Sequence, residues 1–282
     1  MNTNIKHAIR DIVTVLFTMT GTPLWYRRRL QKNGPLVRVL AYHDVPDREA
    51  FERQVRFMRK HFHLVTPQEF QNGVFNRQKV NILLTFDDGY ATWFTNVAPV
   101  LKKYDLGGIF FVTTALLDVA GDEKQENDFC QNNLRISPRK ILSWGQLKTM
   151  TQENPRHEIG SHTVSHPNLH QIDTALIKQE LKESKDTIEK YLNRPVISFA
   201  YPFGVLKTHV SDKIADLVKQ IGYQQAFTTH ISFVPQPRQL FLIPRTCIDP
   251  DAPLWRLRLW VAGSYDLLKN GFSHAVSLAR SR

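Results

Sequence analysis

The sequence feature that most constrains the fold is a short apolar segment that ends in two adjacent carboxylates. Residues 81–86, NILLTF, have the composition of a buried strand, and Asp87, Asp88 and Gly89 follow directly. Burying an unpaired charge costs several kcal/mol, and a bound metal ion is the most direct compensation. The segment therefore predicts a strand that delivers carboxylates to a metal site. Because Asp-Gly is also common turn chemistry, a simple turn is the alternative.

A second segment supplies nitrogen ligands for such a site. Residues 157–167 read HEIGSHTVSHP, in which His162 and His166 are four residues apart. One helical turn or a tight loop could aim both imidazoles at one point. Two histidines and one carboxylate leave coordination positions open for water and substrate, which is typical of a catalytic metal site. The nearby His157 and His170 are expected to be structural or exposed.

Two motifs in these segments resemble those of a known enzyme family. TFDDG at 85–89 and HTVSHP at 162–167 resemble the first two motifs of the polysaccharide deacetylases, also called NodB-homology domains or carbohydrate esterase family 4. Together and in this order they are a specific signature, and the resemblance covers approximately residues 36–250. It implies that the protein removes N-acetyl groups from amino sugars.

The resemblance also assigns roles to the residues of both motifs. It implies that Asp88, His162 and His166 bind a divalent metal, with zinc as the usual ion and nickel, cobalt or manganese as alternatives. It further implies that Asp87 is the general base that takes a proton from the metal-bound water. The chemistry is consistent, because a metal lowers the pKa of its water and polarises the carbonyl while a free carboxylate accepts the proton.

Residues 199–204, FAYPFG, are similar to the third motif of the family. The resemblance implies that this segment forms one wall of the substrate groove and offers a backbone N–H to the oxyanion. Phe203 is the expected donor, because Pro202 has no N–H. The residues expected to contact the substrate or the oxyanion are Tyr201, Pro202, Phe203 and Gly204.

The chain departs from the commoner family pattern at two places. That pattern has an arginine, which orients the catalytic base, where this chain has Ala200. Arg245, at a later strand end, is the candidate to replace it, and a surface arginine beside a turn is the alternative. The usual C-terminal Leu-x-His motif, which carries the general acid, is not evident, and His274 stands in a basic context unlike it.

Tyr42 and His43 offer a solution for the general acid. A Tyr-His pair at the end of the first predicted strand resembles the exopolysaccharide deacetylases that act on poly-N-acetylglucosamine, whose motif order is circularly permuted. That resemblance implies that His43 protonates the leaving amine, with a packed histidine as the alternative. Trp93, Trp144 and Tyr201 are candidates for stacking on sugar rings, although aromatic residues at such spacings are more often part of the core.

Strands that alternate with helices predict a parallel sheet. The expected strands are 36–42, 81–86, 107–113, 196–201, 225–229 and 241–243, with a further one before His162. The expected helices are 47–62, 90–104, 143–150, 172–192 and 211–221, and Thr66 and Glu69 are expected to form a capping box at the start of another helix. Residues 118–140 are expected to be an irregular loop. The candidate residues follow strands, and a parallel barrel brings such positions together on one face. The fold class is therefore α/β, and the resemblance implies a distorted (β/α)7 TIM-like barrel of the NodB-homology type.

The net charge of +11 is concentrated at the two ends of the chain. Residues 1–40 carry seven basic residues against one acidic residue, and 251–282 carry five against two. We therefore expect a basic amphipathic segment at 1–35, a catalytic domain at 36–250 and a basic helical tail at 251–282. This distribution argues against a nucleic-acid partner and for peripheral contact with an anionic membrane surface.

The leading hypothesis is a metal-dependent hydrolase that removes N-acetyl groups from a polysaccharide or a lipid-linked glycan. The expected location is cytoplasmic and peripheral at the inner membrane, and the alternative is export through an uncleaved or atypical signal. Two other functions stay open. One is hydrolysis of another C–N bond, in a formamide or a cyclic imide, on the same fold. The other is a non-catalytic glycan-binding module with a relic site.

Overall fold

The computed structural model describes residues 22–235 and 238–266. Most of the basic segment at 1–35, the second half of the tail at 251–282 and His274 lie outside these residues, so the predictions that concern them stay predictions. No described helix is long and apolar enough to cross a lipid bilayer.

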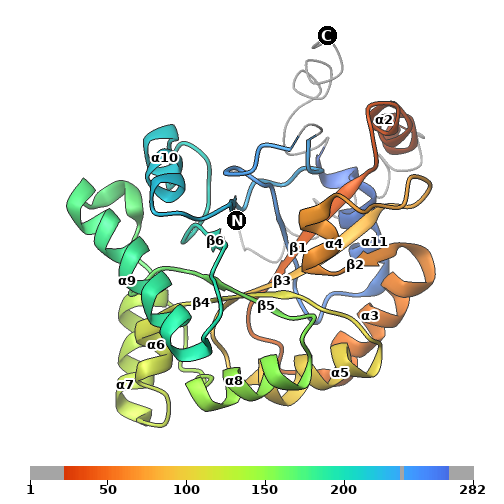
Figure 1. Ribbon diagram of the computed structural model, residues 1–282. Coiled ribbons are helices and arrows are strands. Elements are labelled where there is room, and N and C mark those ends of the chain that lie inside the picture. The colour runs from red at the N-terminus through yellow and green to blue at the C-terminus, as the bar shows by residue number, and fades with distance from the viewer. Residues whose placement is uncertain (1–21, 236–237, 267–282) are drawn as a thin grey trace, which may run out of the picture.

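Parallel strands alternate with helices and form one sheet in the described chain (Figure 1). The strand order is β7-β6-β5-β4-β3-β1-β8, and β2 pairs with β3. The strands are β1 (Val37–Tyr42), β2 (His63–Val65), β3 (Asn81–Asp88), β4 (Ile109–Val112), β5 (Glu158–Ser161), β6 (Ser198–Ala200), β7 (Gln225–Phe227) and β8 (Thr246–Cys247). A parallel bridge between Phe227 and Ile243, just before β8, draws the two sheet edges together. The sheet is therefore a distorted parallel barrel.

Helices surround this sheet (Figure 1). Side-chain caps begin several of them. The predicted capping box of Thr66 and Glu69 is confirmed, and Ser143 and Gln146 form a second one. The helices are α2 (Thr22–Gln31), α3 (Arg48–His61), α4 (Pro67–Asn72), α5 (Ala98–Lys103), α6 (Thr114–Asp118), α7 (Glu123–Phe129), α8 (Trp144–Glu153), α9 (Thr174–Leu192), α10 (Asp212–Gln220) and α11 (Leu254–Ala262).

Three local expectations differ from the structure. Residues 118–140 are not an irregular loop, because they contain α7 and a π-helical turn, η2 (Cys130–Leu134). Asp122 caps α7 by accepting a hydrogen bond from Gln125 N–H. The helix expected over 90–104 begins as a π-helical turn, η1 (Trp93–Val97), before α5. Strands β2 and β8 were not predicted, because three and two residues are too few to show a periodicity.

The two faces of the sheet carry separate apolar clusters. The larger cluster includes Phe86 and Phe110, whose ring centroids are 4.7 Å apart, and the smaller one includes Leu83 and Phe111. Strand β3 is buried along its whole length. Because side chains alternate along a strand, Asp87 lies on the same face as Leu83. The core thus places the first carboxylate of the motif on the face of the smaller cluster.

Gly160 on β5 offers a test of this packing. A Cβ at this position would lie 2.4 Å from Cδ1 of Phe111 and 2.9 Å from Ser198 O. We expect Gly160→Ala to lower the free energy of unfolding by about 1–3 kcal/mol, measured by urea denaturation, because the overlap forces neighbouring strands apart. Gly145→Ala in α8 is the control, since its Cβ would meet only Ser143 Oγ at 3.9 Å. Equal effects of the two substitutions would contradict this packing.

Candidate active site

A cavity of about 470 Å³ lies at the carboxyl ends of the strands, and we call it the strand-end cavity. Its volume is within the usual range for small-molecule sites. The predicted site residues that line it are His43 after β1, Asp87 and Asp88 at the end of β3, His162 and His166 after β5, and Tyr201 and Phe203 after β6.

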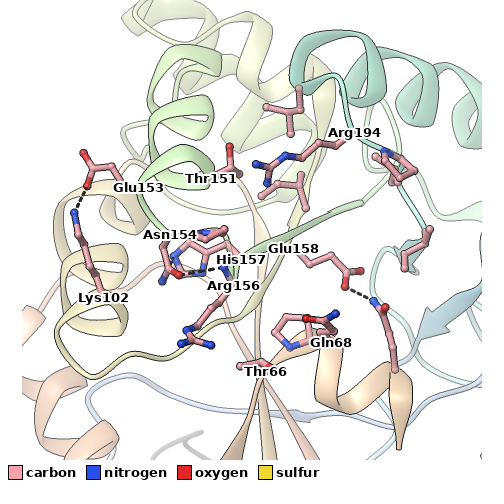
Figure 2. Close-up of a pocket in the computed structure, with 18 of the residues that line it drawn as sticks. Thr66, Gln68, Lys102, Thr151, Glu153, Asn154, Arg156, His157, Glu158 and Arg194 are labelled. Carbon is pink, nitrogen blue, oxygen red and sulfur yellow. Dashed lines mark hydrogen bonds and ion pairs between the residues drawn. The ribbon is translucent and has the colours of Figure 1, made fainter.

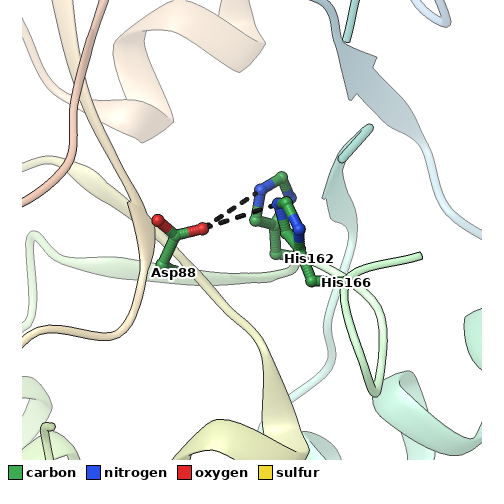
Figure 3. A group of neighbouring side chains, drawn as sticks. All are labelled: Asp88, His162 and His166. Carbon is green, nitrogen blue, oxygen red and sulfur yellow. Dashed lines mark ion pairs between the residues drawn. The ribbon is translucent and has the colours of Figure 1, made fainter. Parts of the chain in front are cut away.

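Asp88, His162 and His166 form a compact group of potential metal ligands (Figure 3). All three side chains are buried, and one ligand atom from each lies within 4.8 Å of the others. Asp88 Oδ1 is 3.6 Å from His162 Nε2 and 3.7 Å from His166 Nε2. Atoms that bind a tetrahedral zinc ion at about 2.0–2.2 Å are about 3.4 Å apart, so these spacings fit such an ion after a small adjustment.

Hydrogen bonds orient two of these three side chains. His162 Nδ1 lies 2.7 Å from Ala200 O, which favours the tautomer that leaves an electron pair on Nε2. Tyr90 donates its hydroxyl proton to Asp88 Oδ2 at 2.7 Å, so Oδ1 faces the histidines. Within the described residues, Nδ1 of His166 has no hydrogen-bond partner. The group is therefore arranged to bind a cation through one carboxylate oxygen and two Nε2 atoms.

The loop that carries the two histidines is fixed from α9. Glu180 accepts hydrogen bonds from the N–H groups of Val164 at 2.8 Å and Ser165 at 3.0 Å. Thr163 Oγ1 accepts the N–H of His166 at 3.0 Å. Thr163 and His166 have φ values of 71° and 59°, in the left-handed region that side chains disfavour. Such strain persists only where surrounding contacts over-determine the conformation, as they do in this loop.

Burial keeps the two histidines neutral. It lowers the pKa of His162, although the charges of Asp87 and Asp88 act in the opposite direction. It also lowers the pKa of His166 to about 4, and the neighbouring His162 adds to this effect. Neutral imidazole is the form that binds a metal ion. The pair is therefore in its ligand form at neutral pH.

Asp87 forms a buried, bidentate ion pair with Arg245. The two carboxylate oxygens lie 2.6 and 2.7 Å from Nη1 and Nη2, and Arg245 also donates to Thr85 Oγ1 and Thr228 O. Burial alone would raise the pKa of Asp87, but the charge and the hydrogen bonds of Arg245 outweigh it and lower the pKa to about 2. The carboxylate is therefore ionised at neutral pH and held in one orientation.

Phe203 presents its backbone to the strand-end cavity in a left-handed conformation, with φ 60°. Gly204 N–H donates to Pro202 O at 2.7 Å, which makes Phe203 the centre of a tight turn. Phe203 N–H has no acceptor in the described part of the chain, as an oxyanion donor requires. A Cβ at Gly204 would lie 2.8 Å from Thr229 N, so the turn needs glycine there.

Tyr201 cannot stack on a sugar ring, which corrects the sequence-based expectation. Its side chain is almost fully buried, and its hydroxyl donates to Phe241 O at 3.0 Å. Pro202 and Gly204 shape the turn around Phe203. Of the third motif, the backbone of Phe203 is therefore the part best placed to meet a substrate.

His43 is exposed on the rim of the strand-end cavity, directly after β1. It lies near enough to Asp87 for its charge to help lower the pKa of that carboxyl, after the larger effects named above. The next residue, Asp44, accepts a hydrogen bond from Thr92 at 2.7 Å and pairs with Arg139 at 2.9 Å. Asp44 thus ties a neighbouring loop to the rim.

Known proteins with similar sequences identify the family. Residues 76–226, more than half of the chain, match the family model for polysaccharide deacetylase. The chain belongs to the polysaccharide deacetylase family. A poly-beta-1,6-N-acetyl-D-glucosamine N-deacetylase from Staphylococcus aureus is 28% identical over 218 residues, which cover 74% of this chain and 70% of that protein. A putative polysaccharide deacetylase from Bacillus subtilis is 23% identical over 224 residues, which cover 75% and 71%.

Solved structures of deacetylases share the fold of this polysaccharide deacetylase. A deacetylase from Streptococcus pyogenes matches with a TM-score of 0.65 and 24% identity, over 80% of this chain and 98% of that one. IcaB from Ammonifex degensii matches with a TM-score of 0.63 and 22% identity, over 81% and 98%. The expectation of a distorted NodB-type barrel is therefore confirmed.

Two tryptophans of the polysaccharide deacetylase are sequence-based candidates for sugar stacking. Trp93 is fully buried, and its Nε1–H donates to His43 O at 2.9 Å, so it supports the rim from the core. Trp144 stacks on Tyr191 with ring centroids 4.3 Å apart and donates to Asp118, outside the strand-end cavity. Sugar stacking is therefore excluded for Trp93, as the core alternative expected, and it stays an untested prediction for Trp144, whose ring is only half-buried.

A second cavity, of about 800 Å³, lies near the amino ends of the strands, where His157 precedes β5 and Glu158 begins it (Figure 2). It is larger than the strand-end cavity, but the amino-end face of a parallel barrel usually serves stability. His157 is buried there, with Nε2 3.3 Å from Asn154 Nδ2 and its ring centroid 4.9 Å from that of Phe110. This histidine is structural, which agrees with the expectation from the sequence.

Glu158 in this second cavity provides a pH-dependent test of the fold. Its carboxyl accepts hydrogen bonds from Gln71 at 2.5 Å and from the hydroxyl of Ser198. Burial raises the pKa of Glu158 to about 7, against the opposing effect of both hydrogen bonds. The folded protein therefore retains a proton that the unfolded chain releases at lower pH.

We expect Glu158→Gln to become more stable relative to wild type as the pH rises. In wild type, Glu158 contributes its full stabilisation of the folded state below the unfolded-state pKa of about 4.5, and this stabilisation is lost as the pH rises through the folded-state pKa of about 7. Glutamine has no proton to lose, so the variant keeps a constant contribution. Urea unfolding at pH 5 and pH 8 should show the difference growing by about 2 kcal/mol. Glu153→Gln, at the surface beside Lys102, is the control. A constant difference for Glu158→Gln would contradict the buried, protonated state.

Proposed function

We propose that this polysaccharide deacetylase removes N-acetyl groups from the amino sugars of a polysaccharide or lipid-linked glycan. The observation that carries the proposal is the buried group of Asp88, His162 and His166 with the ionised Asp87 beside it. A carboxylate and two imidazoles suit zinc best, with nickel, cobalt or manganese as alternatives. When bound, the ion would lower the pKa of a coordinated water and polarise the acetyl carbonyl.

Asp87 is the proposed general base. Each of its oxygens pairs with Arg245, yet a carboxylate oxygen has two lone pairs and can still accept a proton from the attacking water. Arg245 would hold the carboxylate ionised and aimed, in place of the arginine that the commoner family pattern has at the position of Ala200. The pair therefore supports a positioning role for Arg245.

Phe203 and His43 are proposed to complete the reaction. The N–H of Phe203 would stabilise the negative charge that develops on the acetyl oxygen. His43, exposed on the rim, would donate a proton to the amine as the C–N bond breaks, which lets the amine leave in neutral form. The two groups come from different strand ends, so they can meet opposite sides of one acetamide.

The relatives support the substrate class. The Staphylococcus aureus relative is a deacetylase of poly-beta-1,6-N-acetyl-D-glucosamine, and an N-acetylated glycan is the corresponding proposal for this chain. The strand-end cavity, with a volume of about 470 Å³, can accept a sugar residue. A cytoplasmic location at the inner membrane remains a prediction that rests on the charge of the two chain ends.

Asp87→Asn and His162→Ala separate the base from the metal site. We expect wild type and Asp87→Asn to bind about one zinc ion per chain, and His162→Ala to lose most of it because it lacks one of three ligands. Release of acetate from an N-acetylglucosamine oligomer should fall at least about 100-fold in both variants. Zinc is measured by mass spectrometry, and acetate by an enzyme-coupled assay.

His170→Ala is the matched control, because this exposed histidine follows the same motif but lies outside the strand-end cavity. It should keep wild-type zinc content and activity. Zinc-loaded wild type that cleaves a formamide or cyclic imide but no N-acetyl sugar would overturn the substrate. Wild type that binds no divalent metal would overturn the catalytic site in favour of a glycan-binding module.

A further inference from the structure

Helices α2 and α11 form a basic surface on the outside of the barrel. They are far apart in the sequence but in contact in the fold, on the same side of the sheet as α3 (Figure 1). Neither helix contains an acidic residue. The arginines of this surface, which we call the α2–α11 face, are Arg27, Arg28, Arg29, Arg256 and Arg258.

The positive charges of the α2–α11 face are close enough to repel one another. The pKa of Arg27 is lowered, first by burial and then by the charges of Arg38 and Arg258. Within the described residues, Nε of Arg27 has no hydrogen-bond partner. The nearby Asp266 is already engaged, because it forms two hydrogen bonds of 2.9 and 2.8 Å with Arg38. An anionic partner would therefore stabilise this surface.

Exposed apolar side chains accompany the arginines. Trp25 is 51% exposed, Trp255 is 47% exposed and Leu254 is 37% exposed. Of the five tryptophans of the chain, only these two are exposed. The guanidinium of Arg29 lies 5.9 Å from the ring centre of Trp25, and that of Arg256 lies 5.4 Å from Trp255. Indole rings beside cationic groups are typical of the interface between lipid headgroups and acyl chains.

The α2–α11 face is built into the folded body of the protein. Tyr26 of α2 is buried, with its ring centroid 6.5 Å from that of Phe233. Leu257 and Trp260 of α11 belong to the larger core cluster. A partner bound to the α2–α11 face would therefore hold the whole barrel in one orientation.

We propose that the α2–α11 face docks the deacetylase onto an anionic phospholipid bilayer. The arginines would contact the headgroup phosphates, and Trp25, Trp255 and Leu254 would enter the interfacial layer. These apolar side chains favour a bilayer over a soluble polyanion, which would leave them in water. The proposal extends beyond the catalytic chemistry, since it uses none of the residues of the strand-end cavity.

Arg28→Glu/Arg29→Glu tests the charge of this surface in the full chain. We expect wild type to sediment with phosphatidylcholine vesicles that contain phosphatidylglycerol, and to bind phosphatidylcholine alone far more weakly. The double variant should bind the anionic vesicles at least about tenfold more weakly, because four units of charge change near the headgroups. Added salt should weaken wild-type binding.

Lys148→Glu/Lys213→Glu is the matched control, since it changes the charge equally at exposed positions on α8 and α10. It should bind anionic vesicles nearly as wild type does. Trp25→Ala/Trp255→Ala should also lose at least about tenfold in binding. Its control, Leu176→Ala, removes a side chain that is 46% exposed on α9 and should have little effect. Deacetylation of a soluble oligomer should be unchanged in all four variants.

Several outcomes would overturn the proposal. One is an equal loss of vesicle binding in Lys148→Glu/Lys213→Glu and Arg28→Glu/Arg29→Glu, which would mean that the net charge of the protein alone determines binding. Another is wild-type binding by Arg28→Glu/Arg29→Glu. A third is a dimer of wild type in solution that this variant dissociates, without vesicle binding by either protein. Vesicle binding by Asp87→Asn should equal that of wild type, so failure of the catalytic proposal is distinguishable from failure of this one.

Discussion

The ion pair between Asp87 and Arg245 is the interaction on which the rest of the site depends. The two residues are 158 positions apart in the sequence, and their side chains are 2% and 0% exposed. Two charges are buried favourably only when their geometry is good, and loss of one partner typically costs about 3–5 kcal/mol. The barrel supplies that geometry, because the segment that carries Arg245 bridges β7 through Ile243 and continues into β8, which pairs with β1.

Closure of the barrel therefore couples the fold to the proposed chemistry. Strand β3 contributes Asp87 and Asp88, β6 contributes the carbonyl of Ala200 that orients His162, and the segment before β8 contributes Arg245. The left-handed conformations of Asp88, His166 and Phe203 add strain at the same place. That strain is maintained by rigid neighbours, as is common where side chains must be aimed before a substrate arrives.

The sequence predicted the parts of the structure that local patterns determine. The strand at 81–86, the paired histidines and the capping box at Thr66 are each complete within a few residues, so their identity could be read directly. A positioning role for Arg245 was inferred because Ala200 stands where the commoner family pattern has an arginine, and the structure places Arg245 in contact with Asp87. Contact with a membrane was expected from charge and stays a prediction, whereas the contact between α2 and α11 could be seen only in the fold.

Contacts between distant segments could not be predicted in the same way. Tyr90 and Glu180 orient the proposed metal ligands, yet only their positions in three dimensions reveal this. The only signal for Tyr90 in the sequence was its position two residues after Asp88. The burial of Trp93 could not be decided from the sequence, because it depends on how β3, β4 and η1 pack together. Helix α7 was missed because its polar sequence has no apolar stripe.

Anomalous diffraction at the zinc edge, from crystals of zinc-loaded protein, tests the central claim most directly. The account predicts one peak within about 2.0–2.2 Å of Asp88 Oδ1, His162 Nε2 and His166 Nε2. Asp87 should stay paired with Arg245 and outside the coordination sphere. A peak bound by Asp87 in place of Asp88, or one that involves neither histidine, would contradict the account.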